Sequence, residues 1–405
     1  MLNLEGVAML NRNITILAGP KKINKKIDQP FNKTSIEFID ELSKNILASS
    51  KAKKYPDLIT FAFWARRKNI LNLSKNYLNN EIRLGLGTIF HIAPSNMPVN
   101  FIYSFAFSLL SGNSNIVRVS DKDFPQVKIF INSFKKISKL KKFKNVACSN
   151  LFVRYMKNND ITGYFSSLCD GRIIWGGDKT VEEIQKIQLP AKSKSIHFPD
   201  RYSLCILKSS SIKKLKKQDL KTLTNKFYND TYSMDQNACT SPQLIIWVGK
   251  ISNGIKNLFW KTLENEVEKK YKLENIFSLN KYNQLLNDIL KKKIIKKIFK
   301  YKNFIYRVLL NKIPNNFNIE KLRGKWGYYY EYEVDNINKI APLINSKFQT
   351  MSYYGFNKKN LENFIKVNKI SGIDRIVPVG RTLDMGIIWD GYDLPRTLSR
   401  VIDLK

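Results

Sequence analysis

The sequence predicts an α/β protein with a parallel sheet and about two lobes. Residues 85–120 read as strand, helix and strand, the pattern of two parallel strands joined by a helical crossover. Residues 60–205 continue this alternation of strand and helix patterns. At 405 residues, of which 43% are hydrophobic, the chain is long enough to bury a large core and to divide into more than one lobe.

The strand–helix–strand unit follows from its composition. The β-branched run Thr88–Ile92 ends at a cluster of Pro, Ser and Asn, which predicts a turn. The apolar stretch Phe101–Leu110 is too long and unbroken for a strand and predicts a helix, which Gly112-Asn113 ends before strand character returns. Residues 85–87, Gly-Leu-Gly, precede a strand, so they predict a turn and not a dinucleotide-binding loop, whose glycines follow a strand.

Shorter patterns predict the other elements. Residues 1–60 form a mixed leader with an amphipathic helix at Ser35–Leu47. Strands are predicted at Leu244–Val248 and at Tyr328–Val334. Lys-rich patches at residues 213–217 and 291–298 recur at helical spacing and predict the solvated faces of helices.

Basic residues far outnumber acidic ones, yet they are spread along the whole chain. Lysine and arginine total 69 against 33 aspartate and glutamate residues, a formal net charge of +36. The Lys-rich segments are also heavy in Asn and Ile, which indicates a chain-wide bias, and no nucleic-acid-binding motif is present, so we expect no nucleic-acid partner. A basic surface would still attract phosphate-bearing small molecules, an acidic protein or an anionic membrane face.

Neither a membrane span nor a metal site is expected. No run approaches the roughly 18 apolar residues that a spanning helix needs, and the N-terminus lacks a signal-peptide pattern, so we expect the protein in the cytoplasm. The four cysteines show no CxxC or ligand-like spacing, which argues against both disulfides and zinc.

Cys239 is the strongest candidate for a reactive group. It lies in the run Asp235–Gln243 among small and polar residues, whereas structural cysteines usually lie among apolar side chains that raise their pKa. This setting indicates a nucleophile. On the local pattern alone, an inert cysteine in a polar loop is the alternative.

Five segments together resemble the LuxC-type acyl-CoA reductases, a branch of the aldehyde dehydrogenase superfamily that makes fatty aldehydes. The resemblance extends from about residue 60 to the C-terminus, with the segments in the family's order and spacing. The segments are Ser95-Asn96, Ser111 to Arg118, Ile173 to Asp178, the Cys239 run, and Trp389 to Leu394 continuing through Leu398-Ser399-Arg400.

The resemblance implies an aldehyde dehydrogenase-like fold of two lobes, each built on a largely parallel sheet flanked by helices, with the active site in the cleft between them. Residues 1–205 would hold the leader and the nicotinamide-cofactor lobe, and residues 206–370 the catalytic lobe with Cys239. Residues 371–405 would return to the cleft or to a subunit interface. A homo-oligomer is expected, and so is an acyl-transferring or acyl-activating partner protein.

The resemblance also implies NADPH as the cofactor. Arg118, Ser120 and Lys122 match positions near the adenosine ribose and its 2′-phosphate, for which a guanidinium offers paired donors and a permanent charge. The turn Gly176-Gly177-Asp178 matches the one that lies against the pyrophosphate, where missing side chains allow close approach. An ordinary strand-to-helix turn is the alternative there.

The implied reaction is reduction of an acyl-CoA thioester, with Cys239 attacking the carbonyl and forming an acyl-enzyme. Negative charge develops on the carbonyl oxygen, and two donors are implied for it, the Cys239 backbone N–H and the Asn96 side chain. A helix-capping role near Pro98 is the alternative for Asn96.

Two departures from the superfamily pattern bear on the chemistry. The glutamate that activates water in hydrolytic aldehyde dehydrogenases would fall near residues 196–200, where none is present, and its absence favours reduction over hydrolysis. His197 lies at or beside that position and is a candidate catalytic residue, as is His91, with a packed histidine as the alternative for each. The glutamate expected to hold the nicotinamide ribose is missing from residues 322–327.

Two other functions remain open on the sequence. A reductase of another activated acyl donor, such as an acyl phosphate or a carrier-bound acyl group, would share the fold and the cysteine. A non-catalytic basic binding protein would have no need of Cys239 together with Asn96.

Overall fold

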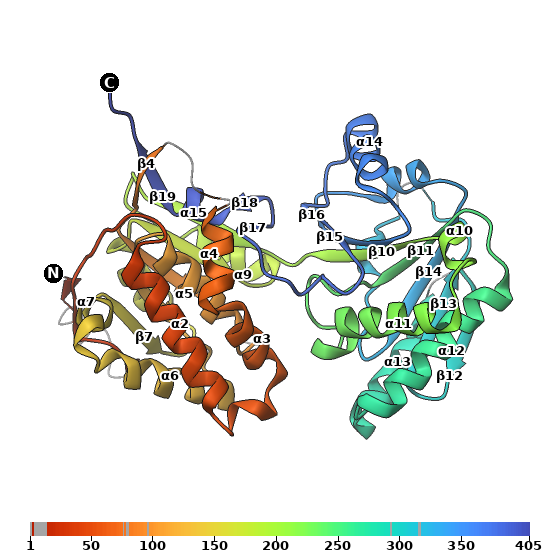
Figure 1. The fold of residues 1–405 in the computed structure, drawn as a ribbon, viewed down its shortest axis with the longest axis horizontal. Helices are drawn as coiled ribbons and strands as arrows, with labels where there is room; N and C mark the ends of the chain where they lie inside the picture. The colour runs from red at the N-terminus through yellow and green to blue at the C-terminus, as the bar shows by residue number, and fades with distance from the viewer. Residues whose placement is uncertain are drawn as a thin grey trace. The chain divides into compact units, whose positions relative to one another are not determined.

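A computed structural model of the protein describes residues 2–3, 14–75, 77, 81–94, 97–291, 294–314 and 317–405. The chain forms two compact units (Figure 1). The first unit comprises residues 1–200 together with 385–405, and the second comprises residues 201–384. The second unit is therefore continuous in sequence, whereas the first is assembled from two separate segments. The lobes expected from the sequence, with limits at residues 205 and 370, remain a prediction.

The first unit contains a six-stranded sheet in the order β2-β7-β6-β5-β8-β9, in which every pair is parallel except β2 with β7. A separate antiparallel pair, β4 with β19, joins residues 82–85 to residues 399–402. The strands are β1 Leu2–Asn3, β2 Thr15–Ala18, β3 Lys22–Ile23, β4 Ile82–Gly85, β5 Thr88–Ile92, β6 Ser114–Arg118, β7 Asn150–Arg154, β8 Gly171–Trp175, β9 Lys194–Phe198, β17 Ile388–Trp389, β18 Tyr392–Asp393 and β19 Ser399–Ile402. The helices are α2 Lys33–Ala48, η1 Ala52–Lys54, α3 Pro56–Trp64, α4 Arg67–Lys75, α5 Asn100–Leu110, α6 Pro125–Ser138, η2 Lys141–Phe143, α7 Lys144–Cys148, α8 Asn159–Ser167, α9 Asp178–Gln185 and α15 Leu394–Thr397.

The strand–helix–strand unit predicted at residues 85–120 is confirmed as β5, α5 and β6, and β5 pairs parallel with β6. Residues 86–87 connect β4 to β5, as predicted for a turn. Gly87 has φ of +138°, a conformation that residues with side chains rarely adopt. Thr88–Ile92 is buried along its whole length, as expected for a strand with helices on both faces of its sheet.

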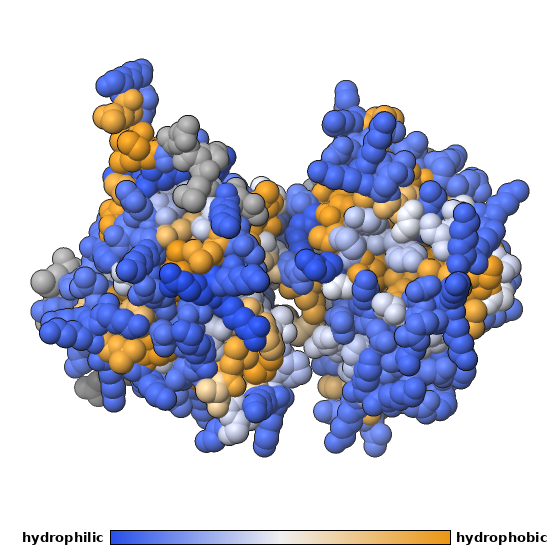
Figure 2. Space-filling view, viewed as in Figure 1, coloured by the Kyte–Doolittle hydropathy of each residue, from blue (hydrophilic) through white to orange (hydrophobic). Residues whose placement is uncertain are grey.

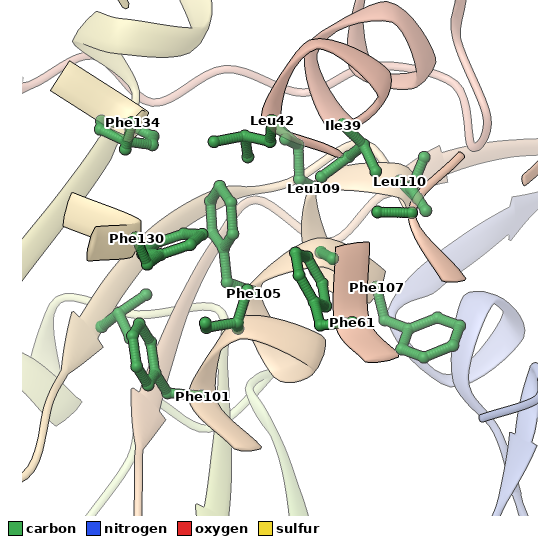
Figure 3. Packing of buried hydrophobic residues seen from close by; sticks show 14 of the residues in the cluster. Ile39, Leu42, Phe61, Phe101, Phe105, Phe107, Leu109, Leu110, Phe130 and Phe134 are labelled. Carbon is green, nitrogen blue, oxygen red and sulfur yellow. The ribbon is translucent and has the colours of Figure 1, made fainter. Parts of the chain in front are cut away.

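Apolar clusters cover both faces of the first sheet. On one face, α5 and α6 pack against the strands, and α2 and α3 add side chains to the same apolar cluster (Figure 3). There Phe152 of β7 contacts the rings of Phe105, Phe130 and Phe134, with centroids 5.1, 5.5 and 4.9 Å away. On the other face, side chains of α8 and α9 pack against alternate residues of the strands, such as Phe90. This two-sided burial fixes the register of the strands, because a one-residue slip would exchange the two faces.

The second unit contains a seven-stranded sheet in the order β12-β13-β14-β11-β10-β15-β16, in which only β12 is antiparallel to its neighbour. Alternate residues of β10 contribute to opposite cores, Leu204 and Ile206 to one and Cys205 and Leu207 to the other. The strands are β10 Tyr202–Lys208, β11 Leu244–Val248, β12 Ile295–Tyr301, β13 Ile305–Leu310, β14 Tyr328–Val334, β15 Phe348–Tyr354 and β16 Arg375–Pro378. The helices are α10 Ser209–Ile212, α11 Lys217–Thr231, η3 Tyr232–Met234, α12 Asn253–Lys270, α13 Asn275–Lys291, η4 Ile319–Lys321, η5 Ile337–Leu343 and α14 Lys358–Asn368.

The predicted helix Ser35–Leu47 is confirmed as α2, and the predicted strands Leu244–Val248 and Tyr328–Val334 are confirmed as β11 and β14. The helical face predicted at residues 291–298 is wrong from residue 295 onward, because β12 begins there and pairs with β13. Residue 291 ends α13, and residues 292 and 293 lie outside the described residues. The lysine spacing fits a helix, but the Ile and Phe residues between the lysines suit a strand, and pairing with β13 decides the outcome. The other Lys-rich patch, residues 213–217, is largely exposed but lies mostly in the turn between α10 and α11.

Hydrophilic residues cover most of the face drawn in Figure 2, with smaller apolar areas among them. Within the described residues, no helix combines the length and the apolar character needed to cross a bilayer. The same residues bring together no group of three or more His, Cys, Asp or Glu side chains that could hold a metal ion.

His91 lies in the core of the first unit and belongs to a chain of polar side chains that crosses three strands. Its Nε2 lies 2.9 Å from Asn115 Oδ1 of β6, and the Asn115 amide donates to Asn150 Oδ1 of β7 at 2.7 Å. Nδ1 lies 2.8 Å from Ser104 Oγ of α5. Because an amide oxygen faces Nε2, that nitrogen carries the proton and the Ser104 hydroxyl donates to Nδ1. Burial lowers the pKa of His91 to about 4, so the ring is neutral and serves the packing of the sheet.

The first unit should therefore lose stability when the pH falls. A histidine whose folded pKa lies below its unfolded value stabilises the fold above pH 6.5, and that stability disappears as the pH falls toward 4. Between pH 7.5 and pH 5 the His91 contribution amounts to about 2 kcal/mol. We expect the melting temperature of His91→Gln to fall less over this interval than that of the natural protein. His197→Gln, at the chain's other and partly exposed histidine, is the control and should keep most of the acid sensitivity. An unchanged pH dependence in His91→Gln would contradict the role of this ring.

Candidate active site

Cys239 differs from the other cysteines in its exposure. Its residue is exposed, whereas Cys169 and Cys205 are buried and Cys148 is partly buried. Burial raises the pKa of the thiols of Cys169 and Cys205 well above the usual value, which keeps them protonated and unreactive. Among the four cysteines, Cys239 is therefore the one whose sulfur a substrate could reach most readily.

The loop that carries Cys239 has a buried base and an exposed tip. Asn237 and Cys239 are exposed, while Gln236 and the residues from Thr240 to Gln243 are buried. The loop begins directly after η3 with two consecutive residues in the left-handed conformation, Asp235 at φ of 53° and Gln236 at φ of 58°. Such a backbone costs energy for residues with side chains and persists only where surrounding contacts hold it.

Gln236 supplies most of those contacts. Its amide nitrogen donates to the carbonyls of Pro242 and Tyr328, at 3.1 and 3.0 Å. Its amide oxygen accepts from the backbone N–H groups of Gly327 and Tyr328, both at 3.1 Å. One buried side chain thus closes the base of the loop and ties it to the start of β14.

Two further side chains hold the other end of the loop. The Gln243 amide donates to the Gln236 carbonyl at 3.1 Å and accepts from the Gly324 N–H at 2.7 Å. Ser203 of β10 donates its hydroxyl to the Cys239 carbonyl at 2.6 Å and accepts from the Thr350 N–H at 3.2 Å. The Cys239 carbonyl is therefore fixed against the central strands of the sheet.

Asp230 of α11 connects the loop to a second segment of the second unit. Its carbonyl accepts from the Ser241 hydroxyl at 2.8 Å. Its carboxylate accepts from the N–H groups of Gly380 and Thr382, at 2.7 and 3.0 Å, and from the Thr382 hydroxyl at 3.0 Å. Burial raises the pKa of Asp230 to about 6, although these three hydrogen bonds act in the opposite direction.

The predicted cofactor residues lie in the first unit, at the carboxyl edge of its sheet. In this sheet β6 and then β7 lie on one side of β5, whereas β8 and then β9, which follow in sequence, lie on its other side. The strand order therefore reverses between β5 and β8, and in open α/β sheets ligands bind outside the carboxyl ends of the strands at such a reversal. Arg118, Ile92 and Ile174 are register partners across β6, β5 and β8, so the predicted residues after β6 and β8 meet at this edge.

Arg118 ends β6 and packs over the ring of Tyr155, with its guanidinium carbon 4.7 Å from the ring centroid. One guanidinium nitrogen donates to the Tyr155 carbonyl at 3.2 Å, while Nε is buried and has no hydrogen-bond partner among the described residues. Ser120 is buried and accepts from the Lys122 N–H at 3.2 Å, and the Lys122 side chain is exposed.

Gly176 and Gly177 connect β8 to α9. A side chain at Gly176 would approach Thr180 to 3.1 Å, whereas one at Gly177 would meet no atom within 4 Å. Asp178 is the first residue of α9, whose opening N–H groups favour an anion. A buried guanidinium nitrogen of Arg118 without a partner among the described residues, and open space at Gly177, fit a phosphate-bearing dinucleotide at this edge.

His197 is a strand residue of β9, and its hydrogen-bond partners Ser195 and Gln185 belong to the first unit. Its Nε2 lies 2.8 Å from Ser195 Oγ, and its Nδ1 lies 3.0 Å from the Gln185 amide of α9. Burial and the Arg172 charge lower the pKa of His197, which favours the neutral ring at pH 7. Asn96, the predicted oxyanion donor, lies outside the described residues.

The structure thus brings the predicted residues together in two groups, Arg118 to Lys122 with Gly176 to Asp178 in the first unit, and Cys239 in the second. Sequence reasoning missed Gln236, Gln243 and Ser203. A signal for Gln243 was present, because the buried strand β11 follows it directly and a long amide there must find partners. Gln236 lies eight positions before that strand and has no such signal. Nothing in the sequence around Ser203, inside an apolar strand, indicates its bond to Cys239.

Residues 65–401 of this chain match the family described as acyl-CoA reductase (LuxC). Among curated proteins, no sequence matches the chain.

Solved structures show an aldehyde dehydrogenase-like fold, as predicted. A salicylaldehyde dehydrogenase from Pseudomonas putida G7 superposes with a TM-score of 0.62 at 11% identity, over 93% of this chain and 85% of that one. A betaine aldehyde dehydrogenase from Staphylococcus aureus, in complex with NAD+, gives 0.60 at 12% identity, over 91% and 82%. A bifunctional proline utilization A protein gives 0.63 at 9% identity over 91% of this chain, which spans only 42% of that longer protein.

We expect Gln236→Glu to destabilise the second unit by about 2 to 4 kcal/mol. The new carboxylate cannot donate to the Pro242 and Tyr328 carbonyls, and it introduces a charge at a buried site. The control is Gln218→Glu, the same chemical change at an exposed position of α11, which should alter stability by less than about 0.5 kcal/mol. The melting temperatures of the two variants provide the measurement, and equal values would show that the Gln236 amide does not hold the loop.

Proposed function

Because this chain belongs to the LuxC family of acyl-CoA reductases, we propose that it reduces a long-chain acyl-CoA to the aldehyde, with NADPH as reductant and Cys239 as nucleophile. The family supports acyl-CoA as the substrate class. The observation that carries the role of Cys239 is its exposed position at the tip of a loop whose base is buried and held by hydrogen bonds.

In the proposed reaction the Cys239 thiolate attacks the thioester carbonyl carbon, and a new carbon–sulfur bond forms as the bond to CoA breaks. CoA leaves as a thiolate and takes up a proton. The acyl carbonyl would then accept a hydride, the chemistry that NADPH would supply when held by the residues named below. The carbon–sulfur bond to Cys239 then breaks, which releases the aldehyde and restores the thiolate, so the overall reaction consumes one NADPH and one proton.

Both tetrahedral species carry negative charge on the former carbonyl oxygen, and N–H donors near Cys239 would stabilise it. We assign this role to the Cys239 backbone N–H and to the Asn96 side chain. The bond from Ser203 to the Cys239 carbonyl supports the first assignment, because it restricts rotation of the backbone beside the nucleophile. Such preorganised donors need no rearrangement when the charge develops.

The proposed NADPH residues are Arg118, Ser120 and Lys122 for the adenosine ribose and 2′-phosphate, and the turn Gly176-Gly177-Asp178 for the pyrophosphate. Their common place at the carboxyl edge of one sheet supports this assignment. Arg118 is the residue best suited to distinguish NADPH from NADH, because a guanidinium pairs with phosphate through more than one hydrogen bond.

His197 is the third proposed catalytic residue. Its pKa lies below the usual range, so at neutral pH it would act as a neutral acid–base group and not as a permanent cation. No glutamate is present at residues 196–200, and this absence favours hydride over water as the nucleophile that attacks the acyl carbon. We also propose that the protein is a homo-oligomer in the cytoplasm and that an acyl-activating or acyl-transferring protein supplies its substrate.

The first test is Cys239→Ala. We expect it to abolish aldehyde formation and covalent acylation together, with a loss of more than about 10³-fold in turnover, because both steps need the thiol. Aldehyde production and incorporation of radiolabelled acyl-CoA into the protein are the measurements. The control is Cys148→Ala, which changes a partly buried cysteine of the first unit and should leave both signals near the natural level.

Retention of labelled acyl-enzyme by Cys239→Ala would overturn the assignment of the nucleophile. Comparing turnover with acyl phosphate and with acyl-CoA distinguishes the two candidate functions, because a reductase of acyl phosphates would turn over the acyl phosphate faster.

The second test concerns the cofactor. We expect Arg118→Ala to raise the KM for NADPH by roughly 10-fold or more, the equivalent of one charge-assisted contact, with little change in the KM for acyl-CoA. Arg67→Ala is the control, since Arg67 is an exposed residue of α4 and has no proposed cofactor role. Steady-state kinetics with NADPH and NADH give both values. Equal use of NADH by the natural protein would refute the 2′-phosphate role.

A further inference from the structure

Helix α13 presents two opposite faces that are both occupied by large side chains, and only one of them packs against the protein. Its inner face carries Lys281, Leu285 and Asp288, all buried. The Lys281 ammonium donates to the Phe304 and Trp326 carbonyls, at 3.1 and 2.8 Å. This face already accounts for the attachment of α13 to the second unit, so the outer face is not needed for folding.

The inner face also continues into the loop that carries Cys239. Phe277 stacks on the ring of Trp326, with centroids 4.8 Å apart. The backbone N–H of Trp326 donates to the Asp235 carbonyl at 3.1 Å. Asp288 accepts from the Tyr328 and Tyr330 hydroxyls, at 2.8 and 2.5 Å. A firmly attached helix can present its outer face in a fixed geometry.

The outer face is apolar and exposed. At helical spacing it carries six of the nineteen large hydrophobic residues that are exposed in the described part of the chain. Leu290 is the most exposed of them, at 81%. An apolar stripe of this size on one element is unusual for a surface that faces only water. The six residues are Ile276, Leu279, Tyr282, Leu286, Ile289 and Leu290.

Positive charge lies beside this stripe at Tyr282. Lys296 and Lys300 of the edge strand β12 are exposed, and the Lys300 ammonium lies 5.5 Å from the centroid of the Tyr282 ring. The one carboxylate of α13, Asp288, is buried, so no acidic side chain of the helix opposes these lysines.

We propose that the outer face of α13 docks on an anionic lipid surface. Apolar side chains flanked by lysines suit the interface between lipid headgroups and acyl chains, where the stripe is buried and the ammonium groups meet lipid phosphates. A second copy of the chain is a poorer occupant. It would bring the same lysines together, and a stripe of six residues falls short of the roughly 20 to 30 residues per partner of a stable interface. The proposal is independent of the catalytic assignment, because docking needs neither Cys239 nor a cofactor.

The test is flotation of the full chain with vesicles at about 0.15 M salt, where exposed charges are screened beyond roughly 8 Å. Vesicles of phosphatidylcholine with phosphatidylglycerol are compared with vesicles of phosphatidylcholine alone. We expect the natural protein to float with the anionic vesicles, and the triple variant Leu279→Gln, Leu286→Gln, Leu290→Gln to lose at least 10-fold in partitioning. The matched control is Leu258→Gln, Ile365→Gln, Val367→Gln, which removes three exposed apolar side chains from α12 and α14 and should stay within 2-fold of the natural protein.

A second variant, Lys296→Gln with Lys300→Gln, leaves the helix unchanged and should lower partitioning to the anionic vesicles at least 3-fold. Melting temperatures establish that each variant is folded. Failure of the natural protein to float, or equal flotation of the stripe variant and its control, would overturn the proposal. So would a change from dimer to monomer in the stripe variant by sedimentation, since it would identify a second copy as the occupant.

Discussion

The buried amide of Gln236 is the interaction on which the position of Cys239 depends. A reactive thiol has to be open to substrate, yet the backbone beneath it cannot be left to water without losing its geometry. The loop meets both demands, because one glutamine satisfies two carbonyls and two N–H groups at its base. The two left-handed residues at its start are stable only in that setting.

The position of the loop also depends on contacts with several other elements of the second unit. Ser203 links the loop to the central strands, Asp230 links it to α11, and the Trp326 backbone links it to α13. These contacts come from residues far apart in sequence, so the loop cannot take its shape before the sheet has assembled. The predicted cofactor residues of the first unit depend on fewer contacts. They lie at the ends of β6 and β8, which both pair with β5, so correct strand pairing is enough to place them.

Much of the fold could be predicted from the sequence because its signals are local. The apolar run of α5 between two turns, and the β-branched runs of β5 and β11, each contain enough information to define an element. Strand β12 could not be predicted, since its lysine spacing suits a helix and only pairing with β13 selects the strand. At the site, Cys239 stood out by its polar neighbours. The role of Ser203 could not be foreseen, because a serine within an apolar strand acquires a function only through a partner 36 positions away.

The division of the chain into a continuous and a discontinuous unit also has a consequence for synthesis on the ribosome. Every residue of the second unit has been made once residue 384 has been added. The first unit still lacks β19, the partner of β4, and the carbonyls of Met385 and Leu398 that accept from Trp64 and Asn113. The segment made first is therefore completed last. Until then the edge of β4 that pairs with β19 stays open, and an unpaired strand edge in a nascent chain is a site where incorrect pairing can begin.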